Sequence, residues 1–180
     1  LYFNLNIFRN DLSYYIIPRN TGETNFATFL PIYKTFGVEA YMYGIENQID
    51  WNMTDEIKLS SSISYTRGEF KSGGSLPQIP PLKGVFGISY TNDVYSFGIN
   101  SEMTADQNYV DAFEEPTAGY IIFNAFGQYS FYSNNLIHNI SINLDNILNR
   151  EHRNHLSRIK SILPEAGFNL RATYKLYFHL

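Results

Sequence analysis

Residues 56–67 read EIKLSSSISYTR, and this stretch decides the fold. Its apolar side chains occupy odd-numbered positions, at Ile57, Leu59, Ile63 and Tyr65, while charged and hydroxyl side chains fill the positions between them. Successive side chains of a β-strand point to opposite faces, so the alternation predicts a strand with one apolar and one polar face. The stretch FNLRATYKLYF at 168–178 repeats the pattern.

The same alternation marks eight strands, near residues 1–9, 37–48, 55–67, 82–91, 94–104, 119–131, 136–144 and 167–178. Each approaches the length of about nine to eleven residues that a tilted membrane-spanning strand needs. Turn-forming residues make up the short connections at Asn52-Met53-Thr54-Asp55, Asn92-Asp93 and Ser133-Asn134-Asn135. These alternate with long connections at 10–36, 68–81, 105–118 and 145–166. The pattern predicts an all-β fold: an antiparallel up-and-down segment of a transmembrane β-barrel, with short periplasmic turns and long extracellular loops.

The composition favours a membrane barrel over a soluble sandwich. Aromatic residues make up 17% of the 180 residues, with 15 Tyr, 14 Phe and one Trp, and charged residues also make up 17%, against about 25% in a typical soluble domain. Aromatic residues near strand ends, such as Tyr65, Tyr90, Tyr129 and Tyr174, are typical of girdles that face lipid. The net charge of −4 provides no basic surface for nucleic acid, and the absence of cysteine excludes disulfides and thiolate metal sites.

Several short motifs follow one another along the chain. Gly37-Val38-Glu39-Ala40 opens the second strand, the proline-containing segment LPQIPP at 76–81 leads into the fourth, and Gly119-Tyr120 opens the sixth. NLDNILNR follows at 143–150 and PEAGF at 164–168. In this order they resemble the C-terminal part of the barrel of TonB-dependent outer-membrane receptors. Two features depart from that family: Phe168 stands where it commonly has Arg, and His179-Leu180 extend past the aromatic Phe178.

The resemblance implies a plugged barrel of about 22 strands in the outer membrane of a Gram-negative-type bacterium. Such a receptor imports a scarce nutrient, here expected to be a metal or a metal chelate such as a siderophore, with energy from the TonB complex. The chain opens directly on a strand pattern, LYFNLNIFRN. We therefore expect residues 1–180 to be the C-terminal part of the barrel, with the plug domain and the TonB-contacting segment upstream. The expected partners are outer-membrane lipid, the plug domain, the TonB complex and a small-molecule or metal ligand, with no resident cofactor.

The sequence does not indicate an enzyme, because it has no G-x-S-x-G, P-loop or H-E-x-x-H motif. The alternative function is a small eight-stranded outer-membrane barrel with an adhesin or structural role, since eight strands suffice to close a barrel filled by its own side chains. Such a protein would need its own signal peptide, so the sequence upstream of Leu1 distinguishes the two.

Polar side chains of the strands are expected to face the barrel lumen, where they hydrate the channel or hydrogen-bond to the plug. The residues assigned to the lumen are Glu39, Lys58, Glu102, Asn124, Arg171 and Lys175.

The last long connection carries two histidines three positions apart, in a stretch at 149–158 that most resembles a subgroup including metal and metal-chelate importers. A short helix capped by Asp145 or Asn146 would bring both imidazoles onto one face. Two imidazoles supply half of a tetrahedral zinc shell, so a carboxylate must complete it. The alternative is that His155 hydrogen-bonds to loop backbone, while His152 is solvated together with the acidic connection at 105–118, which carries Asp106, Asp111, Glu114 and Glu115. The candidate ligands are His152, His155, Glu151, Glu114 and Glu115.

Overall fold

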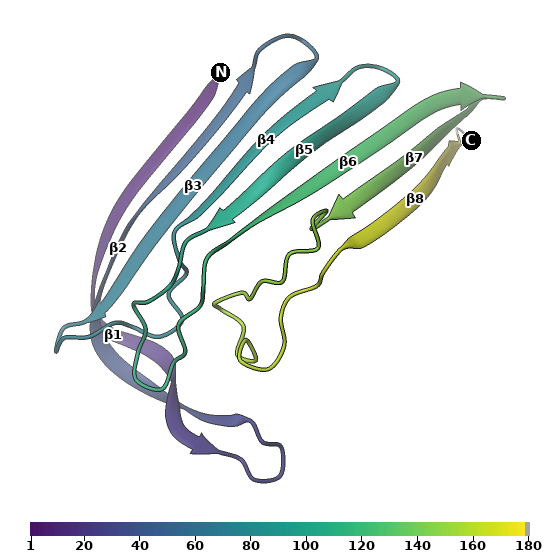
Figure 1. Ribbon diagram of the computed structural model, residues 1–180. Coiled ribbons are helices and arrows are strands. Elements are labelled where there is room, and N and C mark those ends of the chain that lie inside the picture. The colour runs from purple at the N-terminus through teal and green to yellow at the C-terminus, as the bar shows by residue number, and fades with distance from the viewer. Residues whose placement is uncertain (179–180) are drawn as a thin grey trace.

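The computed structural model describes residues 1–178 as one sheet of eight antiparallel strands, in the order in which they occur in the chain (Figure 1). The strands are β1 (Tyr2–Thr24), β2 (Pro31–Asn52), β3 (Ile57–Phe70), β4 (Lys83–Thr91), β5 (Tyr95–Thr104), β6 (Tyr120–Ser133), β7 (Leu136–Asp145) and β8 (Asn169–Phe178). The predicted all-β, up-and-down arrangement of eight strands is confirmed. The departure at His179-Leu180 lies outside the described residues.

Short turns gather at one end of the sheet with both termini, and long loops gather at the other (Figure 1). Asn134 and Asn135 form the two-residue turn between β6 and β7 and both have positive φ, at 49° and 62°, as a type I′ hairpin turn requires. In the β4–β5 turn, the Asn92 side chain accepts the amides of Val94 and Tyr95 at 2.9 and 2.7 Å. The predicted short connections therefore follow from local turn chemistry.

The first connection differs from its prediction, because most of the expected loop at 10–36 is strand. β1 and β2 stay paired as far as Thr24 and Pro31, with two register shifts on the way. Only six residues, Asn25 to Leu30, connect them, and the Asn25 side chain accepts the Ala27 amide at 2.9 Å. The shift after Leu12 leaves extra residues in β1. The shift interrupts the alternation of side chains with a period of two. The sequence pattern therefore did not indicate that the strand continues beyond this point.

Following the register across the sheet divides the side chains between two faces. Lys58 pairs with Ser89, Ser89 with Gly98, Gly98 with Phe126, and Phe126 with Asn143, which pairs with Arg171. Directly paired residues share a face and alternate residues return to it, so a polar face is defined. Its members include Lys58, Glu102, Asn124, Arg171 and Lys175.

Glu39 does not lie on the polar face. The prediction that it faces the lumen together with Lys58 is therefore wrong. Asp50 is on the polar face, because it forms an ion pair with Lys58 at 2.8 Å. β2 pairs with β3 without a shift from Ala40 to Asn52, so Ala40 shares the face of Asp50 and Glu39 lies opposite. The sequence prediction assigned Glu39 to the lumen because its side chain is polar. Its position in the strand, however, decides which face of the sheet it points from.

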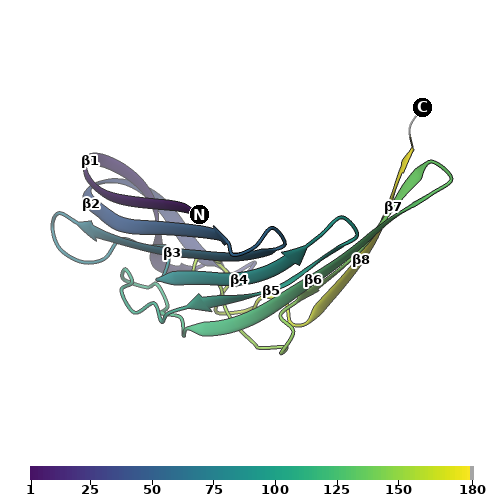
Figure 2. The same ribbon diagram turned by 90° about the horizontal axis from the view of Figure 1, so that it is seen from above.

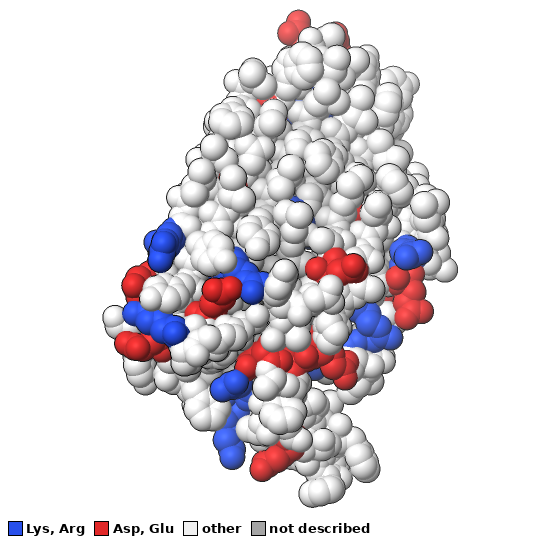
Figure 3. Space-filling view, turned by 60° about the vertical axis from the view of Figure 1, so that its left-hand side comes forward, with Lys and Arg blue, Asp and Glu red and all other residues white. Residues whose placement is uncertain are grey.

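The opposite, apolar face is broadly exposed. Large apolar side chains that are at least 39% exposed point from it on every strand, for example Ile7, Ile45, Ile63, Ile88 and Ile142. The charged side chains concentrate at the loop end of the molecule, and the surface above it is almost free of charge (Figure 3). The sheet is curved along its width, and among the described residues β1 and β8 are not paired with each other (Figure 2).

A small buried apolar cluster lies at the loop end, formed by Ile17, Ala40, Leu76 and Ile79. The β3–β4 loop folds back over the polar face, where the Leu76 amide donates to Gly68 O at 3.0 Å. Gly68 leaves the room for this, because a Cβ there would lie 2.7 Å from Ile79 and 2.9 Å from Leu76. Residues 1–178 contain no helix long and apolar enough to cross a membrane.

Candidate functional site

The long loops contact one another and the β1–β2 hairpin rather than standing separately. Arg19 of the hairpin donates two hydrogen bonds to Asp111 of the β5–β6 loop, at 2.5 and 2.7 Å. In turn, Gln107 of that loop donates through Nε2 to Ile79 O of the β3–β4 loop at 2.9 Å. These side-chain bonds join segments up to 92 residues apart in the sequence.

One carboxylate connects three of the loops. Glu114, in the β5–β6 loop, accepts the backbone amide of Gln78 from the β3–β4 loop at 3.0 and 3.2 Å. Two side chains of the β7–β8 loop also reach it: Lys160 Nζ at 3.4 Å and His155 Nε2 at 3.3 Å. The side chains of Glu114, His155 and Lys160 are only 9%, 1% and 10% exposed, so we call them the buried loop cluster.

The partners of His155 define its tautomer. Thr117 Oγ1 lies 3.0 Å and Lys160 Nζ 3.3 Å from His155 Nδ1. An ammonium group can only donate, so Nδ1 accepts and the ring proton of a neutral His155 is on Nε2. That nitrogen is buried and has no well-aligned hydrogen-bond partner. Its contact with Glu114 at 3.3 Å is therefore a poorly aligned one.

Burial and pairing act in opposite directions on the carboxylate. Desolvation by itself would raise the pKa of Glu114, but His155, the Lys160 charge and the Gln78 amide together hold that pKa below its ordinary value. Desolvation lowers the pKa of Lys160, and the nearby charge of Glu114 offsets this only in part. At neutral pH, Glu114 is therefore a carboxylate with stabilising donors on three sides.

The segment predicted as a short helix is not helical, so that prediction is wrong. Asn146 has a left-handed φ of 49°, and its side chain accepts the Arg150 amide at 2.8 Å and donates to Arg150 O and Ala166 O at 2.8 and 3.2 Å. Asn149 accepts the Phe168 amide at 2.9 Å. Asn146 and Asn149, two of the three asparagines in the NLDNILNR motif, thus fix both stems of the β7–β8 loop through their side chains, as asparagines do in turns.

The two histidines consequently contact different residues. The His152 ring packs on Tyr120 with 4.6 Å between ring centroids, and its Nδ1 lies 3.1 Å from Arg150 O. Of the predicted ligands, the structure brings together His155 and Glu114, whereas Glu151 and Glu115 are exposed. Among residues 1–178, no three His, Asp or Glu side chains gather in a way that could hold a metal.

Sequence reasoning missed Lys160, Thr117 and Gln78. Their roles depend on loops 36 to 46 residues apart meeting in space, which no local pattern indicates. A pocket of about 50 Å³ beside the cluster is lined by Tyr33, Glu115 and Arg158 among others. It has room for about one or two water molecules. The buried loop cluster therefore holds the loops together, and any larger ligand would contact the surface that they form.

The chain matches the family model described as TonB dependent receptor-like, beta-barrel, over residues 1–147. Among solved structures, the copper transporter OprC is 22% identical over 90% of this chain, with a TM-score of 0.75. The ferric citrate transporter FecA is 19% identical over 78%, and the ferric-catecholate import receptor Fiu from E. coli K12 is 18% identical over 97%, each with a TM-score of 0.63. The matches span only 26%, 25% and 25% of those three chains. No curated protein matches the chain.

Proposed function

The chain belongs to the TonB-dependent receptor β-barrel family, and we propose that it is the C-terminal part of an outer-membrane receptor that imports a scarce nutrient with TonB-derived energy. The observation that carries the proposal is the combination of the family match with an eight-stranded meander that has one apolar and one polar face. The plug domain, the earlier strands and the TonB-contacting segment would precede residue 1.

The two faces support a membrane position for the strands. A bilayer removes water from an exposed apolar face, and in a barrel the polar face then surrounds the lumen. Lys58, Glu102, Asn124, Arg171 and Lys175 would face that lumen. Some of them already have partners: Lys58 pairs with Asp50, and Glu102 pairs with Lys83 at 2.9 Å. The unpaired edges of β1 and β8 would continue into the remaining strands of the barrel.

For the substrate, we propose a metal or a metal chelate. The proposal draws on the names of the structural neighbours, which include a copper transporter and a ferric citrate transporter. We place substrate contact on the surface of the joined loops, with His152, Glu151 and Glu115 as the accessible groups. His155 and Glu114 support this surface from beneath, since both side chains are at most 9% exposed.

The proposal is tested with the full-length receptor in cells grown under metal limitation. Uptake of radiolabelled copper and of ferric citrate is compared in strains with and without a functional TonB complex. We expect TonB-dependent accumulation of one of these probes, with a loss at low substrate concentration in the double variant His152→Ala/Glu151→Gln. Asp93→Asn, which changes an exposed charge in the β4–β5 turn at the opposite end of the sheet, serves as the control.

Equal accumulation in both strains, together with a signal peptide directly before residue 1, would favour the small adhesin or structural barrel instead. TonB-dependent uptake that the double variant leaves unchanged would keep the receptor function and reject the assignment of the contact residues.

A further inference from the structure

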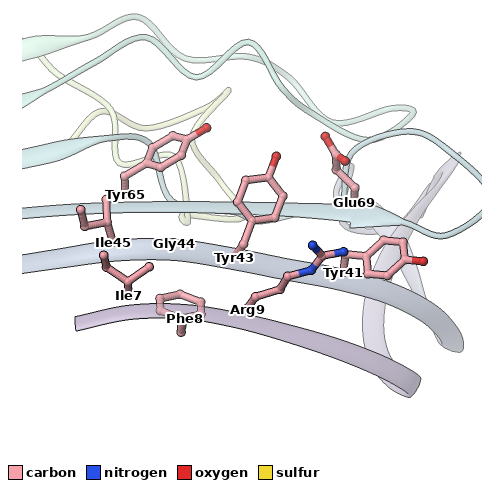
Figure 4. Close-up of a pocket in the computed structure, with 9 residues that line it drawn as sticks. All are labelled: Ile7, Phe8, Arg9, Tyr41, Tyr43, Gly44, Ile45, Tyr65 and Glu69. Atoms are coloured by element: carbon pink, nitrogen blue, oxygen red, sulfur yellow. The ribbon is translucent and has the colours of Figure 1, made fainter.

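A groove of about 550 Å³ opens across the middle parts of β1 and β2 and the part of β3 near its loop end (Figure 4). Most of the side chains around it belong to the apolar face. Ile7 and Ile45 form one end, and Tyr41, Arg9 and Glu69 form the other, with Tyr43 and Tyr65 between them. Along the strand direction, the groove is therefore apolar at one end and polar at the other.

The groove lies where the strands would leave the membrane. β1 begins at Tyr2 and β2 ends at Asn52, both at the turn end of the sheet. Counted from Tyr2, about nine to eleven residues of a tilted strand cross the hydrocarbon layer, which places the far boundary at residues 10–12. Ile7 and Ile45 then lie at the depth of acyl chains, and the long side chain of Arg9 extends from just inside this boundary to the depth of the lipid headgroups.

Arg9 provides an unbalanced charge in this groove. Glu69 has its own partner, because Arg67 Nε lies 2.9 Å from its carboxylate. Within residues 1–178, Arg9 forms no ion pair, and its guanidinium stays 5.6 Å from the Tyr41 ring centroid. Lys71 approaches the same ring at 5.4 Å but is bound to Asp11 at 2.5 Å.

We propose that this groove binds a phosphorylated lipid of the outer leaflet, with an acyl chain along Ile7 and Ile45 and a phosphate on the guanidinium of Arg9. The inference rests on the proposed outer-membrane position. Arginine presents a planar fork that matches phosphate oxygens with two hydrogen bonds. Lipid is the occupant because the groove continues the apolar face, which a soluble anion would leave uncovered.

The full-length receptor is reconstituted into phosphatidylcholine nanodiscs containing either phosphorylated lipid A or the same lipid after enzymatic removal of its phosphates. Lipid bound to the protein is measured by native mass spectrometry. We expect the receptor to retain the phosphorylated form in preference, and Arg9→Gln to lower that preference about tenfold, the usual effect of one lost charge-assisted contact. Arg9→Lys, which keeps the charge but not the fork, should fall between the two.

Lys175→Gln removes a cation from the opposite face and should leave lipid retention unchanged. Inorganic phosphate should not displace the lipid. Equal retention of the two lipid forms, unchanged retention in Arg9→Gln, or full displacement by phosphate would each overturn the lipid site. Failure of the receptor to insert into the bilayer at all, seen as an absent heat-dependent mobility shift on gels, would instead reject the proposed membrane function.

Discussion

Glu114 connects three loops through one carboxylate, so its charge is the residue-scale feature with the largest expected effect. Glu114→Gln keeps an acceptor for the Gln78 amide but leaves Lys160 buried beside His155 without a counter-charge. We expect a local loss of about 2 kcal/mol, a moderate value because the cluster lies near the surface. By hydrogen exchange, the protection of amides in 71–82 and 146–168 should fall roughly 30-fold.

Glu115→Gln is the matched control, because this neighbouring carboxylate is exposed. It should leave the exchange rates unchanged. Adding Lys160→Met to Glu114→Gln removes the unpaired cation and should recover part of the protection, as expected for coupled residues. Equal effects of Glu114→Gln and Glu115→Gln would show that the ion pair does not hold the loops.

The lowered pKa of Glu114 also predicts how the loops respond to acid. A carboxyl group whose folded pKa lies below its ordinary value of 4.5 stabilises the folded loops above that value, and this contribution is lost as the pH falls through the folded pKa. Loop protection, corrected for the intrinsic exchange rate, should thus stay constant from neutral pH to about pH 5 and decrease below pH 4.5. Glu114→Gln should remove this acid dependence, and an unchanged profile in that variant would contradict the mechanism.

At the scale of single elements, the two faces of β7 are tested by neighbouring residues at the same depth. Ile142 points from the apolar face and Ser141 from the polar face. Arginine on the lipid side near the membrane midplane costs about 2–4 kcal/mol, so Ile142→Arg should reduce assembly of the full receptor, whereas Ser141→Arg should not. The folded fraction is measured by heat-dependent mobility on gels. Equal assembly of both variants would mean that the faces are assigned incorrectly.

The β1–β2 hairpin is held to the β5–β6 loop by Arg19 and Asp111. Arg19→Lys cannot form both hydrogen bonds of the guanidinium fork, so the hairpin should become more mobile. Residues 1–180 contain no cysteine, which permits spin labels at Thr28→Cys and Asn108→Cys. We expect a broader distance distribution in Arg19→Lys than in the parent. Glu23→Gln, on the same hairpin and exposed, is the control. A distribution equally narrow in all three proteins would show that Arg19 is dispensable.

At the scale of the whole molecule, the free edges of β1 and β8 determine how residues 1–180 behave alone. Unpaired strand edges recruit other strands, and a closed barrel needs a partner for both. We expect the isolated fragment to form oligomers in detergent, with rapid amide exchange along β1 and β8, while the full receptor is monomeric. Size-exclusion chromatography with light scattering measures this. A monomer with protected edges would instead support a closed eight-stranded barrel.

The sequence alone determined the strands, their two faces and their short turns. Each of these depends on neighbours in the chain: side chains alternate with a period of two, and asparagine side chains or left-handed asparagines close the turns at Asn92 and Asn134. All eight strands were located in this way, although β1 continues to Thr24 and β2 begins at Pro31, so both are longer than the pattern indicated. The same local rule, followed strictly from Asp50, also assigns the face of Glu39.

The tertiary structure decided what happens at the loop end. The extension of β1 and β2 depends on Ile17 packing against Leu76 and Ile79 from another loop. Likewise, His155 became part of a buried cluster because Glu114 and Thr117 meet it from the β5–β6 loop, 38 or more residues earlier in the chain. Loop backbones follow no repeating pattern, so their contacts depend on charges and side chains brought close only when the sheet has formed.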